Sequence, residues 1–309
     1  MFAMVSGSLP LVGGSATHGP DAVAAAVAAQ ATAGLELVTD GGARWPSLPV
    51  AVREALDEGD TGADGLLVRA WRETAALPAA VDRTVAAVVP GPYSSSLAAG
   101  GAPEAPRLAA LLNGELEALA AAGCQLVVVE EPAAVAIGTD EEARAAFREA
   151  QLALLGDVPP LHVMLSITGG SAWEAGAETI LAAPYRSYLL DLIAGPDNWY
   201  LARAVPGDRG IACAALKAPS LEDQAPLLVW AAHYAASMQG RGLGRVGLAN
   251  ASPLGGLAPE SAAAAMAALA RAAAFAEMEP QEAIEAGLDR RTFAQPRGRG
   301  ARRGGLPRA

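Results

Sequence analysis

The chain has 309 residues, of which 52% are hydrophobic and 18% are charged, with a formal net charge of −11. No apolar run reaches the roughly 20 residues that cross a bilayer, and no basic segment precedes an apolar stretch at the N-terminus. We therefore expect a soluble, cytoplasmic protein with no membrane partner, built as one large barrel or two small domains.

Predicted strands alternate with predicted helices along the whole chain. The strands are expected at residues 2–6, 35–39, 84–89, 125–130, 161–167, 199–204, 211–216 and 245–248. The helices are expected near residues 21–33, 65–76, 106–122, 140–155, 175–192, 221–238 and 259–277. Between the second and third strands, the segment with Trp45, Pro46 and Pro49 is predicted as a loop.

About eight β–α units in one chain favour parallel strands covered by helices. The strands are rich in Val, Leu and Ala without alternation, which is typical of strands buried on both faces. The predicted fold is α/β, a single (β/α)8 TIM barrel. An open doubly wound sheet is the second choice, because no glycine-rich dinucleotide fingerprint follows the first strand.

The charge is distributed unevenly, and this divides the chain. No acid follows Asp289, whereas seven arginines do; removing them from −11 leaves −18 for residues 1–289. We predict the barrel over residues 1–289 and a basic, Arg/Gly-rich, disordered tail over residues 290–309. An acidic body argues against a nucleic-acid-binding barrel face, so nucleic acid is not an expected partner apart from the tail.

Polar residues at strand ends are the site candidates, since a barrel places its site at the C-terminal ends of its strands. Ser8 follows the first strand and offers a hydroxyl to a carboxylate. Asp40 and Arg44 follow the second strand, where they either orient a zwitterion or pair with each other. Glu130 and Glu131 end a run of valines, where a buried acid needs a ligand amine or a structural ion pair.

Histidines and cysteines give no metal signature. His18, His162 and His233 lack ligand spacing, and Cys124 and Cys213 form no CxxC pair. We interpret all five as structural residues. No nucleophile elbow and no Walker loop occurs in the sequence.

Five segments, in order, resemble motifs of the cobalamin-independent methionine synthase superfamily. Residues 7–10 resemble its G-S-F-P, and AGLELVTDGGAR at 33–44, preceded by Gln30, resembles its G-L-D-x-x-T-D-G-E-x-R. Residues 90–92, 122–133 and 252–257 resemble its G-P loop, its A-G-x-x-x-I-Q-x-D-E-P-A and its S-P-x-C-G-L. The likeness covers about residues 3–275 and fits the single-barrel members, a UROD/MetE-like fold.

The resemblance implies a 5-methyltetrahydrofolate–homocysteine methyltransferase in which zinc activates the thiol, with a folate as the methyl donor. The corresponding ligand positions here hold no donor atoms: Leu165, Ile167, Ala202 and Gly255. A shift of one residue on the fifth strand offers only Ser166 and Thr168, and the family's catalytic His falls near Ala215. We therefore expect no metal, and we assign no catalytic residue.

The resemblance also implies that Ser8 lies near a substrate carboxylate and that Glu130 binds a substrate amine. The predicted substrate-binding residues are Ser8, Asp40, Arg44, Glu130 and Glu131, with Thr168 at the same barrel mouth. The expected ligand is a small amino acid or thioether. A diverged methyltransferase is favoured; a non-catalytic amino-acid or folate-binding barrel and metal-free chemistry like that of uroporphyrinogen decarboxylase relatives stay open.

Overall fold

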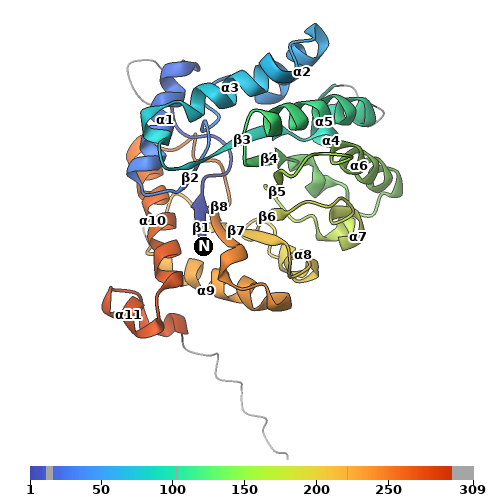
Figure 1. The fold of residues 1–309 in the computed structure, drawn as a ribbon. Coiled ribbons are helices and arrows are strands. Elements are labelled where there is room, and N and C mark those ends of the chain that lie inside the picture. The colour runs from blue at the N-terminus through green and yellow to red at the C-terminus, as the bar shows by residue number, and fades with distance from the viewer. Residues whose placement is uncertain (12–16, 100, 102–103, 221, 294–309) are drawn as a thin grey trace, which may run out of the picture.

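Eight parallel strands and a surrounding layer of helices make up the fold (Figure 1). The computed structural model describes residues 1–11, 17–99, 101, 104–220 and 222–293. The strands are β1 (Phe2–Met4), β2 (Leu37–Val38), β3 (Thr84–Pro90), β4 (Leu126–Glu130), β5 (His162–Ile167), β6 (Ser187–Asp191), β7 (Gly210–Leu216) and β8 (Val246–Asn250).

The strand order closes the sheet into a barrel. Each strand from β2 to β8 pairs in parallel with the next, and β1 returns to β8 with Ala3 opposite Leu248. Among the described residues β1 and β2 share no ladder, but just beyond them the Leu9 amide donates to the Gly41 carbonyl at 2.8 Å. The single (β/α)8 barrel is confirmed, with a seam between β1 and β2, and the open doubly wound sheet is excluded.

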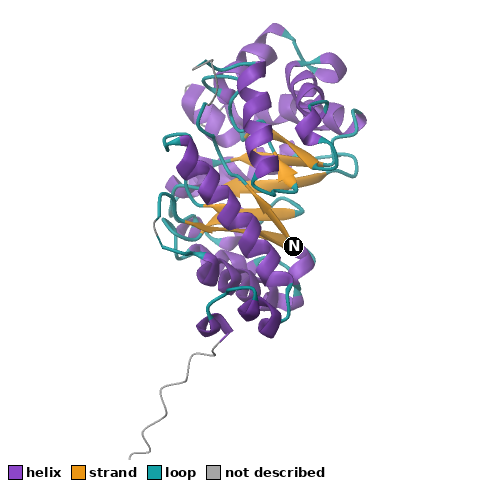
Figure 2. Ribbon diagram, turned by 90° about the vertical axis from the view of Figure 1, so that its left-hand side faces the viewer, coloured by secondary structure: helices purple, strands orange, loops and turns teal. Residues whose placement is uncertain are grey.

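Helices surround the strands on all sides in the two perpendicular views (Figures 1 and 2). They are α1 (Pro20–Thr32), α2 (Leu48–Glu58), α3 (Leu66–Ala75), α4 (Pro92–Ala99), α5 (Ala105–Ala121), α6 (Glu141–Leu154), α7 (Ala177–Ile180), α8 (Asn198–Ala204), α9 (Ala225–Ser237), α10 (Pro259–Glu277) and α11 (Pro280–Glu285). No helix in the described ranges is long and apolar enough to span a membrane.

Two apolar cores result from the alternation of side chains along the strands. The barrel interior is filled by Met4, Leu37, Ala86, Leu126, Val128, Met164, Leu189, Ala212, Ala214 and Ala249, with Phe2 packed against them. A Cβ placed on Gly247 would lie 2.3 Å from the Phe2 ring, so this glycine makes the room for Phe2. The larger core lies between strands and helices.

The predicted sixth strand is wrong. Residues 199–204 lie in helix α8, and β6 lies inside the predicted helix 175–192. Short apolar runs do not distinguish strand from helix by hydropathy. In α8 the buried residues are Asn198, Leu201 and Ala202, which is helical spacing, whereas all five residues of β6 are buried.

The predicted loop around Pro49 is wrong at its C-terminal end, because α2 begins there. Pro49 lies in the first turn of α2, where its missing N–H costs nothing, and Gly59 ends the helix in the left-handed conformation at φ 76°. A further predicted boundary moves at α9, which begins at Ala225 rather than near 221. The expectation of a disordered tail falls mainly on residues 294–309, outside the described residues.

Candidate functional site

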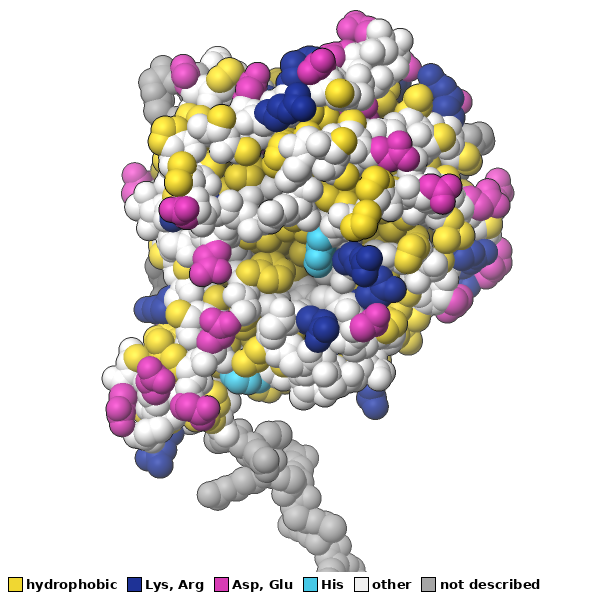
Figure 3. Space-filling view, in the orientation of Figure 1, with side chains coloured by type: hydrophobic (Ala, Val, Ile, Leu, Met, Phe, Trp, Pro, Cys, Tyr) yellow, Lys and Arg dark blue, Asp and Glu magenta, His cyan; other side chains and the backbone are white. Residues whose placement is uncertain are grey.

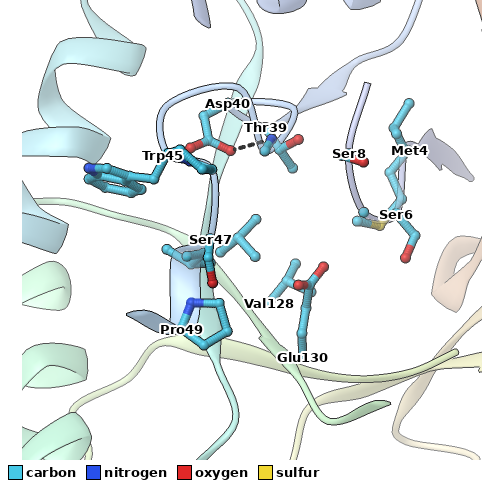
Figure 4. A pocket seen from close by; sticks show the side chains of 16 residues that line it. Met4, Ser6, Ser8, Thr39, Asp40, Trp45, Ser47, Pro49, Val128 and Glu130 are labelled. Atoms are coloured by element: carbon cyan, nitrogen blue, oxygen red, sulfur yellow. Dashed lines mark hydrogen bonds between the residues drawn. The ribbon is translucent and has the colours of Figure 1, made fainter. Parts of the chain in front are cut away.

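A cavity of about 320 Å³ opens at the C-terminal ends of β1 to β4, on the seam side of the barrel (Figure 4). Its floor is made by Met4, Val88 and Val128, which come from three strands. The full lining is Met4, Val5, Ser6, Gly7, Ser8, Thr39, Asp40, Gly42, Trp45, Pro46, Ser47, Leu48, Pro49, Val88, Val128 and Glu130.

The turn that carries Ser8 depends on Gly7. Its φ of 72° is left-handed, and a Cβ there would lie 3.0 Å from the Pro253 side chain. A side chain at this position is therefore excluded both by strain and by contact. The Ser8 carbonyl in turn accepts from the Leu254 amide at 2.9 Å, which ties the turn to the segment after β8.

Asp40 is positioned by a buried glutamine on α1. The Gln30 amide donates to the Thr39 carbonyl at 2.8 Å, and its Oε1 accepts from the Thr39 amide at 3.0 Å. This side chain therefore replaces the ladder partner that β2 lacks on its seam side. The Gly42 amide then donates to the Asp40 carboxylate at 2.9 Å. Gln30 occurs in the sequence motif, but nothing in the motif indicates this role.

Two carboxylates face one cavity without a basic residue in its lining. Figure 4 shows Asp40 and Glu130 on opposite sides of the space, with Ser8 beside Met4 and Ser6. Burial, and then the negative charge of Asp40, raise the pKa of Glu130 to about 7, against a smaller lowering by the Gly7 amide. Burial also raises the pKa of Asp40, opposed by the Gly42 hydrogen bond and the Arg44 charge.

The N-terminus of α2 forms another part of the cavity wall. Ser47 is its N-cap residue, and the Ser47 side chain makes no capping hydrogen bond. The first intrahelical bond runs from the Ala51 amide to the Ser47 carbonyl, so the Leu48 and Val50 amides precede it. Ser47 and Leu48 line the cavity, which places the positive end of a helix dipole at its edge.

Arg44 does not line the cavity. Its guanidinium contacts Glu73 at 2.5 Å, the Ala70 carbonyl and the Thr74 hydroxyl, on α3. The side chain is only 10% exposed. Arg44 therefore acts on the cavity only through its charge, which lowers the pKa of Asp40.

Glu131 points away from the cavity and is fully buried. It accepts from the Tyr93 amide at 3.0 Å, from the amide and hydroxyl of Ser94 at 2.8 and 2.6 Å, and from Gln151 at 2.6 Å. These bonds fasten the start of α4 to β4. Burial raises the pKa of Glu131, and the hydrogen bonds from Ser94, Gln151 and Tyr93 oppose it.

Thr168 follows β5 and is not among the cavity-lining residues, so the structure brings together Ser8, Asp40 and Glu130 but not Thr168. On β5, Leu165 and Ile167 belong to the helix-facing core, whereas Met164 lies inside the barrel. Strand alternation therefore directs Ser166 and Thr168, rather than Leu165 and Ile167, toward the inside of the barrel.

The position assigned to the sixth-strand ligand also changes. Ala202 lies in α8, and the residue that ends β6 is Asp191. Asp191 is fully buried, and its carboxylate accepts from the amides of Gly169 at 3.0 Å, Ile193 at 2.9 Å and Ala194 at 2.8 Å. Its oxygens are thus committed to backbone donors.

The remaining donor set does not fit the zinc site that the resemblance implies. A Cβ on Gly255 would lie 2.4 Å from Oγ of Ser8, so Ser8 occupies the space that a side chain at 255 would need. Ala215 belongs to the helix-facing core. Within the described ranges, no three His, Cys, Asp or Glu side chains are grouped as metal ligands would be.

Solved structures share the barrel at low sequence identity, while no protein-family profile and no curated protein matches the chain. A B12-independent methionine synthase from Shewanella sp. W3-18-1, in complex with selenomethionine, is 14% identical with a TM-score of 0.68, covering 92% of this chain and 98% of that one. A vitamin-B12-independent methionine synthase of putative assignment from Listeria monocytogenes is 15% identical with a TM-score of 0.70, covering 90% and 98%. A methyltransferase from Methanosarcina mazei is 13% identical with a TM-score of 0.59, covering 82% and 85%. At these identities the likeness establishes the fold alone.

Proposed function

We propose that this methyltransferase-like barrel binds a small amino acid, of the methionine or thioether kind, as a zwitterion in the cavity at the β1–β2 seam. The observation that carries the proposal is the pair Asp40 and Glu130, which face one cavity whose lining contains no Lys, Arg or His. Two acids in one desolvated space favour a cationic ligand, because an ammonium group compensates both.

The amine is placed between the two acids. The repulsion that helps to raise the pKa of Glu130 becomes attraction when an ammonium lies beside it. At an effective dielectric of about 20, one such contact at about 4 Å contributes roughly 4 kcal/mol before desolvation is subtracted. Binding therefore favours ionised Glu130, and the ligand displaces its proton.

The carboxylate is placed at the α2 N-terminus. The Leu48 amide, the Ser47 hydroxyl and the helix dipole are suited to an anion at the edge of the cavity. Ser8 lies on the facing wall and adds a second hydroxyl. The acids thus offer a partner to the ammonium group, and the α2 N-terminus and Ser8 offer one to the carboxylate.

The methyltransferase part of the proposal is supported by the shared fold, the strand-end motifs and the selenomethionine in the Shewanella structure. A free thiol is mostly protonated near neutral pH, so methylation of homocysteine needs an activator. The donors at the corresponding positions do not fit zinc, so we expect little turnover of homocysteine with methyltetrahydrofolate. A rate near the ordinary enzyme range of about 1–1000 s⁻¹ would contradict this.

Calorimetry with three matched compounds tests the binding site. Methionine carries both charged groups, 3-(methylthio)propylamine lacks the carboxylate, and 4-(methylthio)butanoate lacks the amine. We expect methionine to bind best and the butanoate to lose at least about tenfold, since its carboxylate leaves Asp40 and Glu130 uncompensated.

Glu130→Gln should weaken methionine binding, whereas Glu117→Gln, at an exposed position of α5, should leave it unchanged. Butanoate binding equal to that of methionine, or insensitivity of methionine binding to Glu130→Gln, would refute the amine site. Methionine binding with no methyl transfer to any thiol acceptor would favour the non-catalytic barrel.

A further inference from the structure

A second cavity, of about 300 Å³, lies at the opposite end of the barrel, where β5, β6 and β7 begin. Arg186 and Arg209 line it together with an apolar wall that includes Val158, Pro159, Pro160 and Pro184. Figure 3 views this face and shows an imidazole and several basic side chains gathered beside a hollow near its centre. None of these residues belongs to the amino-acid cavity.

Arg209 is held in place by the backbone. Its guanidinium donates to the carbonyls of Pro184 at 3.2 Å and Tyr185 at 3.0 Å. Its acidic neighbour, Asp208, is 71% exposed and lies 3.5 Å from Nε, so it neutralises Arg209 only weakly. The guanidinium is thus oriented before any ligand arrives.

Arg186 supplies a second charge that the protein leaves unpaired. Arg186 immediately precedes β6 and lines the cavity. Within the described ranges, its side chain makes no hydrogen bond or ion pair. Burial, and then the charge of Arg186, lower the pKa of His162, whose Nε2 lies 2.8 Å from Oγ of Ser187. Two guanidinium groups therefore line one space, and His162 lies close enough to Arg186 to feel its charge.

The apolar wall sets the kind of anion. A small inorganic ion would leave most of about 300 Å³ unfilled, and the rigid rings of Pro159, Pro160 and Pro184 offer flat surface to an organic group. Seven of its nine lining residues are apolar in type and two are arginines, so apolar contacts and charged donors meet in one cavity. Two guanidinium groups suit the double negative charge of a phosphate monoester better than the single charge of a carboxylate.

We propose that this cavity binds a phosphomonoester that carries a small apolar or planar group. The phosphate lies between Arg186 and Arg209, and the organic group lies against the prolines. The barrel body, residues 1–289, carries −18, so an anion approaches only where cations dominate locally, as they do here. The site is independent of the amino-acid cavity, which opens at the other ends of the strands.

The test is calorimetry of the full chain with phenyl phosphate, inorganic phosphate and benzoate. Phenyl phosphate should bind more tightly than either of the other two. Arg186→Gln should weaken it by about tenfold or more, because it removes a charged donor. The matched control is Arg245→Gln, which removes the same charge just before β8 but does not line the cavity, and it should change the affinity less than about threefold.

The comparison of variants decides the outcome. Equal losses in both variants would reduce the effect to general surface charge and overturn the proposal. Benzoate binding as well as phenyl phosphate would also overturn it, by showing that the second negative charge is not recognised. Methionine binding should be unaffected by Arg186→Gln, so failure here and failure of the amino-acid site are separate results.

Discussion

Glu130→Gln should stabilise the ligand-free protein at pH 8, although it removes the proposed amine partner. Burial and the Asp40 charge raise the pKa of Glu130 from 4.5 to about 7, so folding penalises its ionised form. Glutamine mimics the protonated form and avoids this penalty. In the wild-type protein, the contribution of Glu130 to the free energy of unfolding should therefore be fully present below about pH 4.5 and be lost as the pH rises through about 7.

The magnitude follows from the size of the shift. The rise in the pKa of Glu130 from 4.5 to about 7 sets an upper limit of roughly 3 kcal/mol at pH 8. Because the cavity is open to water, we expect about half of this, or about 1.5 kcal/mol. For a domain of this size, that corresponds to a rise in Tm of roughly 3 °C.

Denaturant unfolding and thermal melts at pH 5 and pH 8 provide the measurement, on wild type, Glu130→Gln and the control Glu117→Gln. The gap between wild type and Glu130→Gln should be small at pH 5 and widen at pH 8, while the control runs parallel to wild type. A gap that shrinks as the pH rises, or a variant less stable than wild type at pH 8, would show that Glu130 is stabilised by a cation that the structure does not place there.

Two other substitutions test the separate roles of Asp40 and Glu131. Asp40→Asn removes the charge that raises the pKa of Glu130, so the pH at which Glu130 ionises should move down, seen as a lower midpoint in the pH dependence of stability. Glu131→Gln places an amide nitrogen among the donors of Ser94 and Gln151 and should destabilise by about 3 kcal/mol, with methionine affinity per folded molecule unchanged; a melt within 2 °C of wild type would contradict this.

The sequence was sufficient for the barrel because each strand is a short apolar run with a helix after it, and seven of the eight predicted strands overlap observed ones. The prediction failed where a strand and a helix were equally compatible with the hydropathy of the segment. Trp199–Ala204 reads as a strand until the burial of Leu201 and Ala202 shows helical spacing. Because of that error, the position corresponding to the sixth-strand zinc ligand was assigned to Ala202 in α8 instead of to Asp191 at the end of β6.

The candidate site was predictable only in part, because a strand end does not reveal which way its side chains point. Ser8, Asp40 and Glu130 meet at one cavity, but neighbouring Arg44 and Glu131 are turned to α3 and α4. The α2 N-terminus was missed, although a serine followed two residues later by a proline is a known helix start. Contacts across the barrel, such as Gln30 with Thr39, have no signal in a single sequence.

The two halves of the barrel mouth differ in how their polar groups are satisfied. After β6 and β8, two buried polar side chains are matched within the protein: Asp191 by three backbone amides, and Asn250 by the backbone of Ser6 and Ser252. After β1, β2 and β4, two acids and a helix N-terminus face open space. Asp40 and Glu130 accept hydrogen bonds from the backbone amides of Gly42 and Gly7, but no cationic side chain lines their cavity, so a ligand that supplies the positive charge would compensate them. We infer that, at this mouth of the barrel, ligand recognition is concentrated at the seam.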